Sequence, residues 1–196
     1  MNSFFAMMSR MKYIDRWALM RNSRDENLSE HSLEVSMIAH ALAVIGTTGL
    51  KKELNAERAA VLGLYHDATE IITGDMPTPV KYYNTEIKNT YKDIERKASH
   101  TLLRMLPDSM QEAYRRIFEK QSEDDYLWKL VKAADKLSAY IKCVEEEQTG
   151  NLEFVRAKEQ TLCHIRQMRL PEAELFLEYF MDAYGKNLDE LTGGEA

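Results

Sequence analysis

Cysteine and proline are scarce in this chain, and their scarcity narrows what the protein can be. The 196 residues include two cysteines and four prolines. Cys143 and Cys163 stand alone and form no C-x-x-C pair, so the sequence indicates neither a disulfide framework nor a cysteine-based zinc or redox motif. We therefore expect both thiols to be buried residues on helix faces.

Long apolar runs and excess positive charge are also missing. No run approaches the roughly 18 apolar residues that a membrane-spanning helix needs, and Arg10 and Lys12 interrupt the short apolar patch at the start of the chain, which is too short for a signal-peptide core. The net charge of −6 argues against a general basic surface for a nucleic acid polymer. We expect a cytoplasmic protein without a membrane partner, in which any phosphate ligand is met by local cations.

What is present is typical of one globular domain built from helices. Hydrophobic residues make up 44% of the chain and charged residues 30%, without an internal repeat or a linker. Apolar residues recur at helical spacing almost throughout, and no segment alternates persuasively as a strand would. We predict a single all-α domain over residues 1–196, with a frayed tail from about residue 187.

Capping residues and breakers set the expected helix boundaries. A non-helical link containing Pro77 and Pro79 is expected between the second and third helices. The predicted helices run from Asn27, in a capping-box pattern with Glu30, to Gly46 and Gly49; from Asn55 to Gly74; from Asn84 to about Leu106; from Ser109 to about Glu119; from Ser122 to about Gln148; from Asn151 to about Arg169; and from Pro171 onward.

Four residues offer a set of metal ligands. His66 and Asp67 are adjacent, His31 lies upstream and Asp135 downstream, and two imidazoles with two carboxylates suit a divalent first-row metal. Asp135 falls on an apolar helical stripe, where an unpaired carboxylate would be costly. Each signal alone also fits an ordinary hydrogen-bonded core residue. Together they indicate a site assembled by the tertiary fold, whose metal could activate a water molecule for hydrolysis.

The surrounding segments carry a family resemblance. His31, His66-Asp67 and Asp135, in this order on a helical background, resemble the metal signature of the HD-domain phosphohydrolase superfamily. Its bacterial 5′-deoxynucleotidases are similar to this chain over nearly its whole length, in the segments DRWALMRN, ENLSEHSLEVSMIAHAL, YHDATEIITGDMPTPVKY and VKAADKLSAYIKCVEE. The resemblance implies an HD-domain helical fold and a metal-dependent phosphomonoesterase that converts 2′-deoxyribonucleoside 5′-monophosphates to deoxynucleoside and phosphate.

The same resemblance implies a cofactor and an assembly. His31, His66, Asp67 and Asp135 match the metal ligands, and three of them, His31, Asp67 and Asp135, are also expected beside the substrate. The expected ion is Co²⁺ or Mn²⁺. The expected assembly is a homodimer, for which the apolar residues of LFLEYFMDAY provide a face.

Substrate and catalytic roles carry over to seven further positions. Arg16 is expected to bind the phosphate and offset charge developing during its transfer, and Trp17 to form a wall for the sugar or base. Glu70, one helical turn after His66, is expected as an acid or base, or as a partner of a ligand histidine. The substrate loop comprises Asp75, which engages a sugar hydroxyl or the reacting water; Thr78, which contacts the phosphate; and, between them, Met76 and Pro77. Glu119 lies where the family has an acidic contact, but the local match is too loose to assign it.

Three rival functions follow from the same residues. Other reactions of the superfamily, such as triphosphohydrolysis or cyclic phosphodiester cleavage, do not usually share the GD-x-PTPVKY loop, and the chain is short for the first. A di-iron oxygenase would need more histidine ligands than five histidines can readily provide. A catalytically idle nucleotide sensor would not need every ligand together with Glu70 and Asp75.

Overall fold

The protein is a set of helices joined by short turns. The computed structural model describes residues 2–81 and 83–193, with positions 78 and 79 described by their backbone alone. The α-helices are α1 Phe4–Met8, α2 Leu28–Thr48, α3 Ala56–Tyr65, α4 Glu70–Thr73, α5 Thr78–Lys81, α6 Thr85–Leu103, α7 Asp108–Phe118, α8 Asp125–Gln148, α9 Val155–Gln167, α10 Pro171–Phe180 and α11 Leu188–Leu191. The short 3-10 helices are η1 Ser9–Tyr13, η2 Ser122–Asp124, η3 Leu152–Phe154 and η4 Met181–Gly185, and the strands are β1 Asp15–Arg16 and β2 Glu26–Asn27.

Asparagine caps begin three of the long helices, as the sequence predicts. The side chains of Asn27, Asn55 and Asn84 each accept a hydrogen bond from a backbone N–H in the first turn of α2, α3 and α6. These bonds satisfy N–H groups that have no partner within a helix. The prediction of an all-α domain is confirmed, and the two-residue strands are too short to leave a periodic signal.

Three predicted boundaries are wrong. The helix expected to continue to Gly74 ends at Tyr65, and a turn over residues 66–69 separates α3 from α4. The link expected to be non-helical contains α5, in which a proline in the first turn is tolerated because N–H groups there lack helical partners in any case. The helix expected from Ser122 begins at Asp125, after the 3-10 turn η2.

The chain also departs from prediction near three other helix ends. The helix expected from Asn151 begins at Val155, after the 3-10 turn η3. α2 continues through Gly46 and ends at Thr48, with Gly49 as its C-cap, as predicted. The tail expected to be frayed contains the one-turn helix α11, which begins with a capping box between Asn187 and Glu190. Reciprocal hydrogen bonds between side chains and backbone at such a start stabilise a helix too short to form alone.

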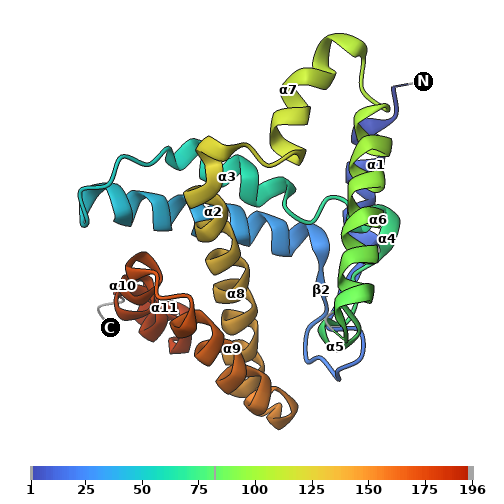
Figure 1. Ribbon diagram of the computed structural model, residues 1–196. Coiled ribbons are helices and arrows are strands. Elements are labelled where there is room, and N and C mark those ends of the chain that lie inside the picture. Colours follow the sequence, from blue (N-terminus) through green and yellow to red (C-terminus); the bar gives the residue numbers. More distant parts are fainter. Residues whose placement is uncertain (1, 82, 194–196) are drawn as a thin grey trace.

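The main core lies where α2, α3 and α8 meet. In Figure 1, α2 and α3 run side by side and α8 crosses them, with α9 and α10 packed against its lower half. Burying these apolar side chains removes them from water, which is the main favourable term in folding. Members of this core include Val35, Leu42, Leu62, Leu130, Leu137, Ile141, Ile165 and Phe176.

A second, smaller cluster joins the N-terminal segment to α6 and α7. Phe4 of α1 is almost fully buried and packs with Leu102, Leu103 and Leu106, while Tyr114 of α7 meets the Phe4 ring edge to face. This cluster supports the part of the chain that leads into β1. Among the described residues, no helix is long and apolar enough to span a membrane.

Candidate metal and substrate site

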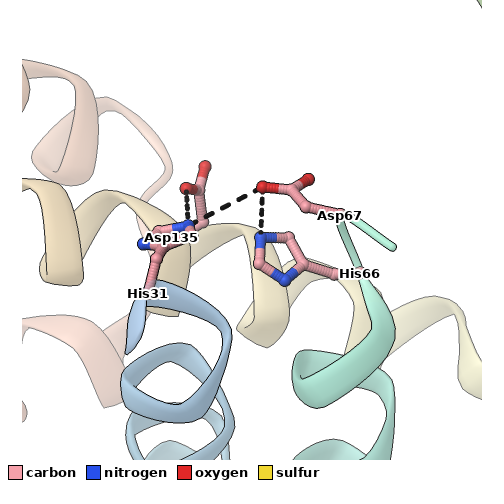
Figure 2. A group of neighbouring side chains, drawn as sticks. All are labelled: His31, His66, Asp67 and Asp135. Carbon is pink, nitrogen blue, oxygen red and sulfur yellow. Dashed lines mark ion pairs between the residues drawn. The ribbon is translucent and has the colours of Figure 1, made fainter. Parts of the chain in front are cut away.

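The four residues predicted as metal ligands converge at the ends and middle of three helices. His31 lies in the first turn of α2, His66 and Asp67 follow the last turn of α3, and Asp135 lies in the middle of α8. One ligand atom from each lies within 4.8 Å of the others. Figure 2 shows the carboxylates of Asp67 and Asp135 beside the two imidazoles. The prediction that His66 and Asp67 lie within a helix is wrong, because they occupy the turn after it.

Close approach of α2 and α3 brings the two histidines together. A Cβ at Gly63 would lie 2.9 Å from the Ser36 Cα and 3.1 Å from the Val35 carbonyl oxygen, so a glycine is required for the helices to come this near. The His31 and His66 rings are then 5.3 Å apart between centroids. One small residue in α3 therefore sets the distance between two groups far apart in sequence.

Hydrogen bonds fix which nitrogen of His66 faces the site. Its Nδ1 lies 2.8 Å from the carbonyl oxygen of Gly63. A carbonyl oxygen can only accept, so Nδ1 carries the proton and the neutral ring has its lone pair on Nε2.

A longer chain of hydrogen bonds does the same for His31. The Ser138 hydroxyl donates to the Glu34 carboxylate over 2.5 Å, which leaves its oxygen free to accept from His31 Nδ1 at 3.0 Å. His31 Nε2 is therefore the lone-pair nitrogen that points toward Asp67 and Asp135. A hydrogen bond from the outer ring nitrogen of a ligand histidine is typical of metal sites.

The inward-facing atoms are all electron-pair donors, and this arrangement fits a cation. The Nε2 atoms of His31 and His66 are buried and have no hydrogen-bond partner among the described residues. His66 Nε2 lies 3.0 Å from an Asp67 oxygen, and His31 Nε2 lies 3.3 Å from an Asp135 oxygen. Lone pairs and carboxylates this close repel one another unless a positive charge lies among them.

The electrostatics of the group point the same way. Burial lowers the pKa of His66, but the charges of Asp67 and Asp135 outweigh burial and raise it to about 9. Burial raises the pKa of Asp67, but contact with His66 lowers it to about 2. The site thus stabilises positive charge, which a divalent ion would supply.

Arg16, expected to bind substrate, ends β1 at the edge of the metal group, and Trp17, also expected to bind substrate, directly follows it. An Arg16 terminal nitrogen lies 3.7 Å from an Asp67 oxygen, and the Arg16 side chain is largely buried. Burial lowers the pKa of Arg16, but Asp135, Glu26 and Asp67 together raise it. The guanidinium is therefore a charged group held beside the proposed ion.

Trp17 has an unusual backbone. Its φ of 57° lies in the left-handed region, which costs a bulky residue about 1–3 kcal/mol and persists only where neighbours enforce it. The Trp17 carbonyl oxygen accepts from the Met20 N–H at 2.8 Å, and the ring packs on Phe154 with centroids 5.4 Å apart. Such strain is common where a side chain is presented to a ligand.

Glu26, which was not predicted from the sequence, connects Arg16 and Trp17 to His31 of the metal group. One Glu26 carboxylate oxygen accepts the Trp17 indole N–H at 2.9 Å, and the other lies 3.5 Å from His31 Nδ1. The only signal in the sequence was that Glu26 begins the segment ENLSEHS. In the sequence, a single glutamate there cannot be distinguished from a surface residue. Only the pairing of β2 with β1 brings it to Arg16.

Glu70 and Asp75, expected in catalysis, lie close enough to Asp67 and Arg16 for those charges to shift their pKa values. Glu70 opens α4 and is 5% exposed, and one of its carboxyl oxygens has no hydrogen-bond partner in the described structure. Burial, with the charges of Asp67 and Asp75, raises the pKa of Glu70 to about 9. Burial also raises the pKa of Asp75, while Arg16 counteracts it. The expectation that Glu70 shares a helix with His66 is wrong, since the turn after α3 intervenes.

The other expected substrate residues follow α4, and Glu119 lies at the end of α7. Gly74, with φ of 72°, ends α4 and redirects the chain into Asp75, Met76 and Pro77. Thr78 begins α5, and its side chain is outside the described residues. Glu119 follows α7, and its carboxylate pairs with Arg115 at 3.2 Å and lies 3.7 Å from His100. Among the described residues, the Glu119 carboxylate forms neither a hydrogen bond nor an ion pair with the metal group.

The chain is similar to known proteins over nearly its whole length. The YfbR-like 5′-deoxynucleotidase family matches residues 3–184. A 5′-deoxynucleotidase of Erwinia tasmaniensis is 47% identical over 189 residues, covering 96% of each chain, and one of Yersinia pestis is 48% identical over 195 residues, covering 98% of each.

Solved structures share the fold at lower identity. An HD-domain phosphohydrolase from Listeria innocua has a TM-score of 0.80 and 24% identity, covering 97% of this chain and 95% of its own. The HD phosphohydrolase DatZ of cyanophage S-2L, bound to dA and one catalytic Zn²⁺, has a TM-score of 0.64 and 17% identity, covering 91% and 96%. By sequence match over nearly its full length, the chain belongs to the YfbR-like 5′-deoxynucleotidase family, and its fold is that of the HD-domain phosphohydrolases.

Proposed function

We propose that this protein is a metal-dependent 5′-deoxynucleotidase that hydrolyses 2′-deoxyribonucleoside 5′-monophosphates to deoxynucleoside and phosphate. The observation that carries the proposal is the pair of buried, unpartnered Nε2 atoms of His31 and His66 facing two carboxylates, beside the Arg16 guanidinium. Full-length relatives named 5′-deoxynucleotidase support the substrate class.

His31, His66, Asp67 and Asp135 would hold one divalent ion through the four atoms that lie within 4.8 Å of one another. When bound, the ion supplies Lewis-acid activation of water and of the phosphate. Two neutral imidazoles and two carboxylates nearly neutralise a dipositive ion and exclude little beyond soft Cu(I), so the proposal of Co²⁺ or Mn²⁺ rests on the family resemblance.

Arg16 binds the phosphate group. Its planar guanidinium can hold two phosphate oxygens at once and offset negative charge that grows in the transition state. Two carboxylates approach different nitrogens of the guanidinium: Asp67 lies 3.7 Å from Nη1 and Glu26 lies 3.6 Å from Nε. The buried guanidinium is therefore held in place without being saturated by hydrogen bonds, and Arg16 Nε has no such bond within the described residues.

Glu70 transfers a proton, and Asp75 acts on the water or the sugar. In the reaction a water oxygen bonds to phosphorus, the bond from phosphorus to the 5′ oxygen breaks, and that oxygen gains a proton. Glu70, whose free carboxyl oxygen is buried beside the group, is the acid or base for this transfer. Asp75, which precedes Met76, Pro77 and the first residue of α5, Thr78, orients the water or binds a sugar hydroxyl.

The test is phosphate release from a panel of nucleotides in the presence of different divalent ions. We expect release from deoxyribonucleoside 5′-monophosphates and little from triphosphates or cyclic nucleotides. A matched panel with Asp135→Ala controls for contaminating phosphatases. Tight nucleotide binding without release under any metal would instead identify an idle sensor.

A further inference from the structure

Glu26 and Arg16 are directly opposed in the two-stranded pair formed by β1 and β2. The strands are antiparallel, and their register places Arg16 opposite Glu26 and Asp15 opposite Asn27. This pairing places the Glu26 backbone next to that of Arg16, one residue before Trp17. Opposed residues in such a register have side chains within reach of each other.

The Glu26 carboxylate divides its two oxygens between different partners. Oε2 accepts the Trp17 indole N–H at 2.9 Å and lies 3.6 Å from Arg16 Nε, whereas Oε1 faces the His31 ring. The Glu26 side chain is 12% exposed, so water competes little for these contacts. The bond to Trp17 is the strongest by geometry, and a charged acceptor strengthens it further.

Trp17 needs such a restraint more than most residues. Its left-handed backbone fixes the position of Cβ, but the indole can still rotate about its two side-chain torsions. Phe154 packs against the ring on one side, and packing alone does not set the direction of the N–H edge. The hydrogen bond to Glu26 sets that direction.

We propose that Glu26 is a positioning residue that fixes the Trp17 indole for sugar selection, through the hydrogen bond from the indole N–H to Glu26 Oε2. This inference rests on the proposed function and on the expectation that the Trp17 ring forms a wall for the sugar or base of a deoxynucleotide.

Steady-state kinetics on dAMP and AMP test the proposal. Glu26→Ala removes the acceptor and should shrink the preference for dAMP over AMP by about threefold or more, mainly through KM for dAMP. Glu26→Gln retains an oxygen that accepts the indole N–H, and the preference should stay within about twofold of the wild type. Glu30→Gln, an exposed neighbour at the start of α2, is the matched control and should change nothing.

A double-mutant cycle separates positioning from general damage. Trp17→Phe keeps an aromatic ring but removes the five-membered ring with its N–H donor. It should shrink the preference at least as much as Glu26→Ala does, and the double variant should lose little more than Trp17→Phe alone. An unchanged preference in Glu26→Ala, an equal loss in Glu26→Gln, or additive losses in the double variant would each overturn the proposal.

A nuclear magnetic resonance readout does not depend on activity. The chain has two tryptophans, at positions 17 and 128, so Trp17→Phe assigns the indole N–H signals. In Glu26→Ala the Trp17 signal should shift upfield and exchange faster with water, while Glu26→Gln should restore slow exchange. A Trp17 signal unmoved in Glu26→Ala would overturn the proposal. An inactive wild type with the expected shifts would overturn only the proposed function.

Discussion

His66 Nδ1 lies 2.8 Å from the carbonyl oxygen of Gly63, one turn earlier in the chain. This contact orients the imidazole and leaves Nε2 toward Asp67. The same glycine lets α3 approach α2, because a Cβ there would meet the α2 backbone at Ser36. Gly63 thus sets both the direction of one proposed ligand and its distance from another.

Gly63→Ala tests this double role. The new methyl group should force α2 and α3 apart, lowering the free energy of unfolding by about 1–3 kcal/mol and weakening metal affinity. Chemical denaturation and metal titration measure the two effects. Gly185→Ala is the control, since its Cβ would meet only the flexible end of the Gln148 side chain at 3.3 Å. Wild-type metal affinity in Gly63→Ala would contradict the role of close helix packing.

Removal of a proposed metal ligand should abolish activity without unfolding the protein. We expect His66→Ala and Asp135→Ala to lose metal binding and phosphate release while keeping a helical circular dichroism spectrum, because the core of α2, α3 and α8 does not depend on these side chains. His40→Ala, on the exposed face of α2, is the matched control. Near wild-type turnover with bound metal in either ligand variant would refute the assignment.

Sugar selection should depend on Trp17 more than on Arg16. A 2′-hydroxyl buried without a partner costs about 1–3 kcal/mol, so kcat/KM should favour dAMP over AMP by at least about tenfold. Trp17→Ala should narrow this gap, and Arg16→Ala should instead depress turnover on both substrates. Equal kcat/KM for the two nucleotides in the wild type would sink this explanation.

Stability at low pH should reflect Glu146. The residue is 2% exposed, pairs with Lys142 and accepts from the Ser23 N–H and the Asn151 side chain, both at 2.8 Å. Burial raises the pKa of Glu146, but these contacts outweigh it and lower the pKa to about 2.

A lowered pKa in the folded state stabilises the protein above the ordinary value near 4.5, and this stabilisation disappears as the pH falls toward 2. Glu146→Gln should therefore be less stable than the wild type at pH 7. The difference in the free energy of unfolding should shrink by about 2 kcal/mol as the pH falls from the ordinary value of 4.5 toward 2. Denaturation curves at several pH values measure it, with exposed Glu174→Gln as the control. A difference that does not change with pH would contradict this role.

The homodimer stays a prediction that light scattering can check. Tyr179 and Phe180 on α10 are 59% and 43% exposed, and Leu188 and Leu191 of α11 are also exposed. Apolar residues gathered on neighbouring elements are typical of an interface. We expect a particle of twice 22.7 kDa at micromolar concentration. A particle of 22.7 kDa would contradict the expectation.

Local signals in the sequence were sufficient for three helix starts but not for the site's detailed geometry. Asn27, Asn55 and Asn84 mark helix starts because their caps bond to residues two or three positions away. The turn at residues 66–69 left no such signal, since the apolar pattern continues through it.

The residues of the site were visible in the sequence to different degrees. His31, His66, Asp67 and Asp135 form a recognisable ordered set, and the structure brings them together. Glu26 and Ser138 could not be identified, because their contacts with His31 arise only when β2, α2 and α8 meet. Residues that hydrogen-bond to the outer nitrogen of a ligand histidine follow no characteristic spacing in the sequence.

The most direct test of the metal-dependent nucleotidase is reconstitution of the stripped enzyme. Chelator-treated protein should release no phosphate from dAMP, and Co²⁺ or Mn²⁺ should restore release in proportion to bound metal, with saturation at about one ion per chain. Asp135→Ala should bind no stoichiometric metal under the same conditions. Full activity in protein freed of metal, or metal bound at wild-type stoichiometry in Asp135→Ala, would contradict the account.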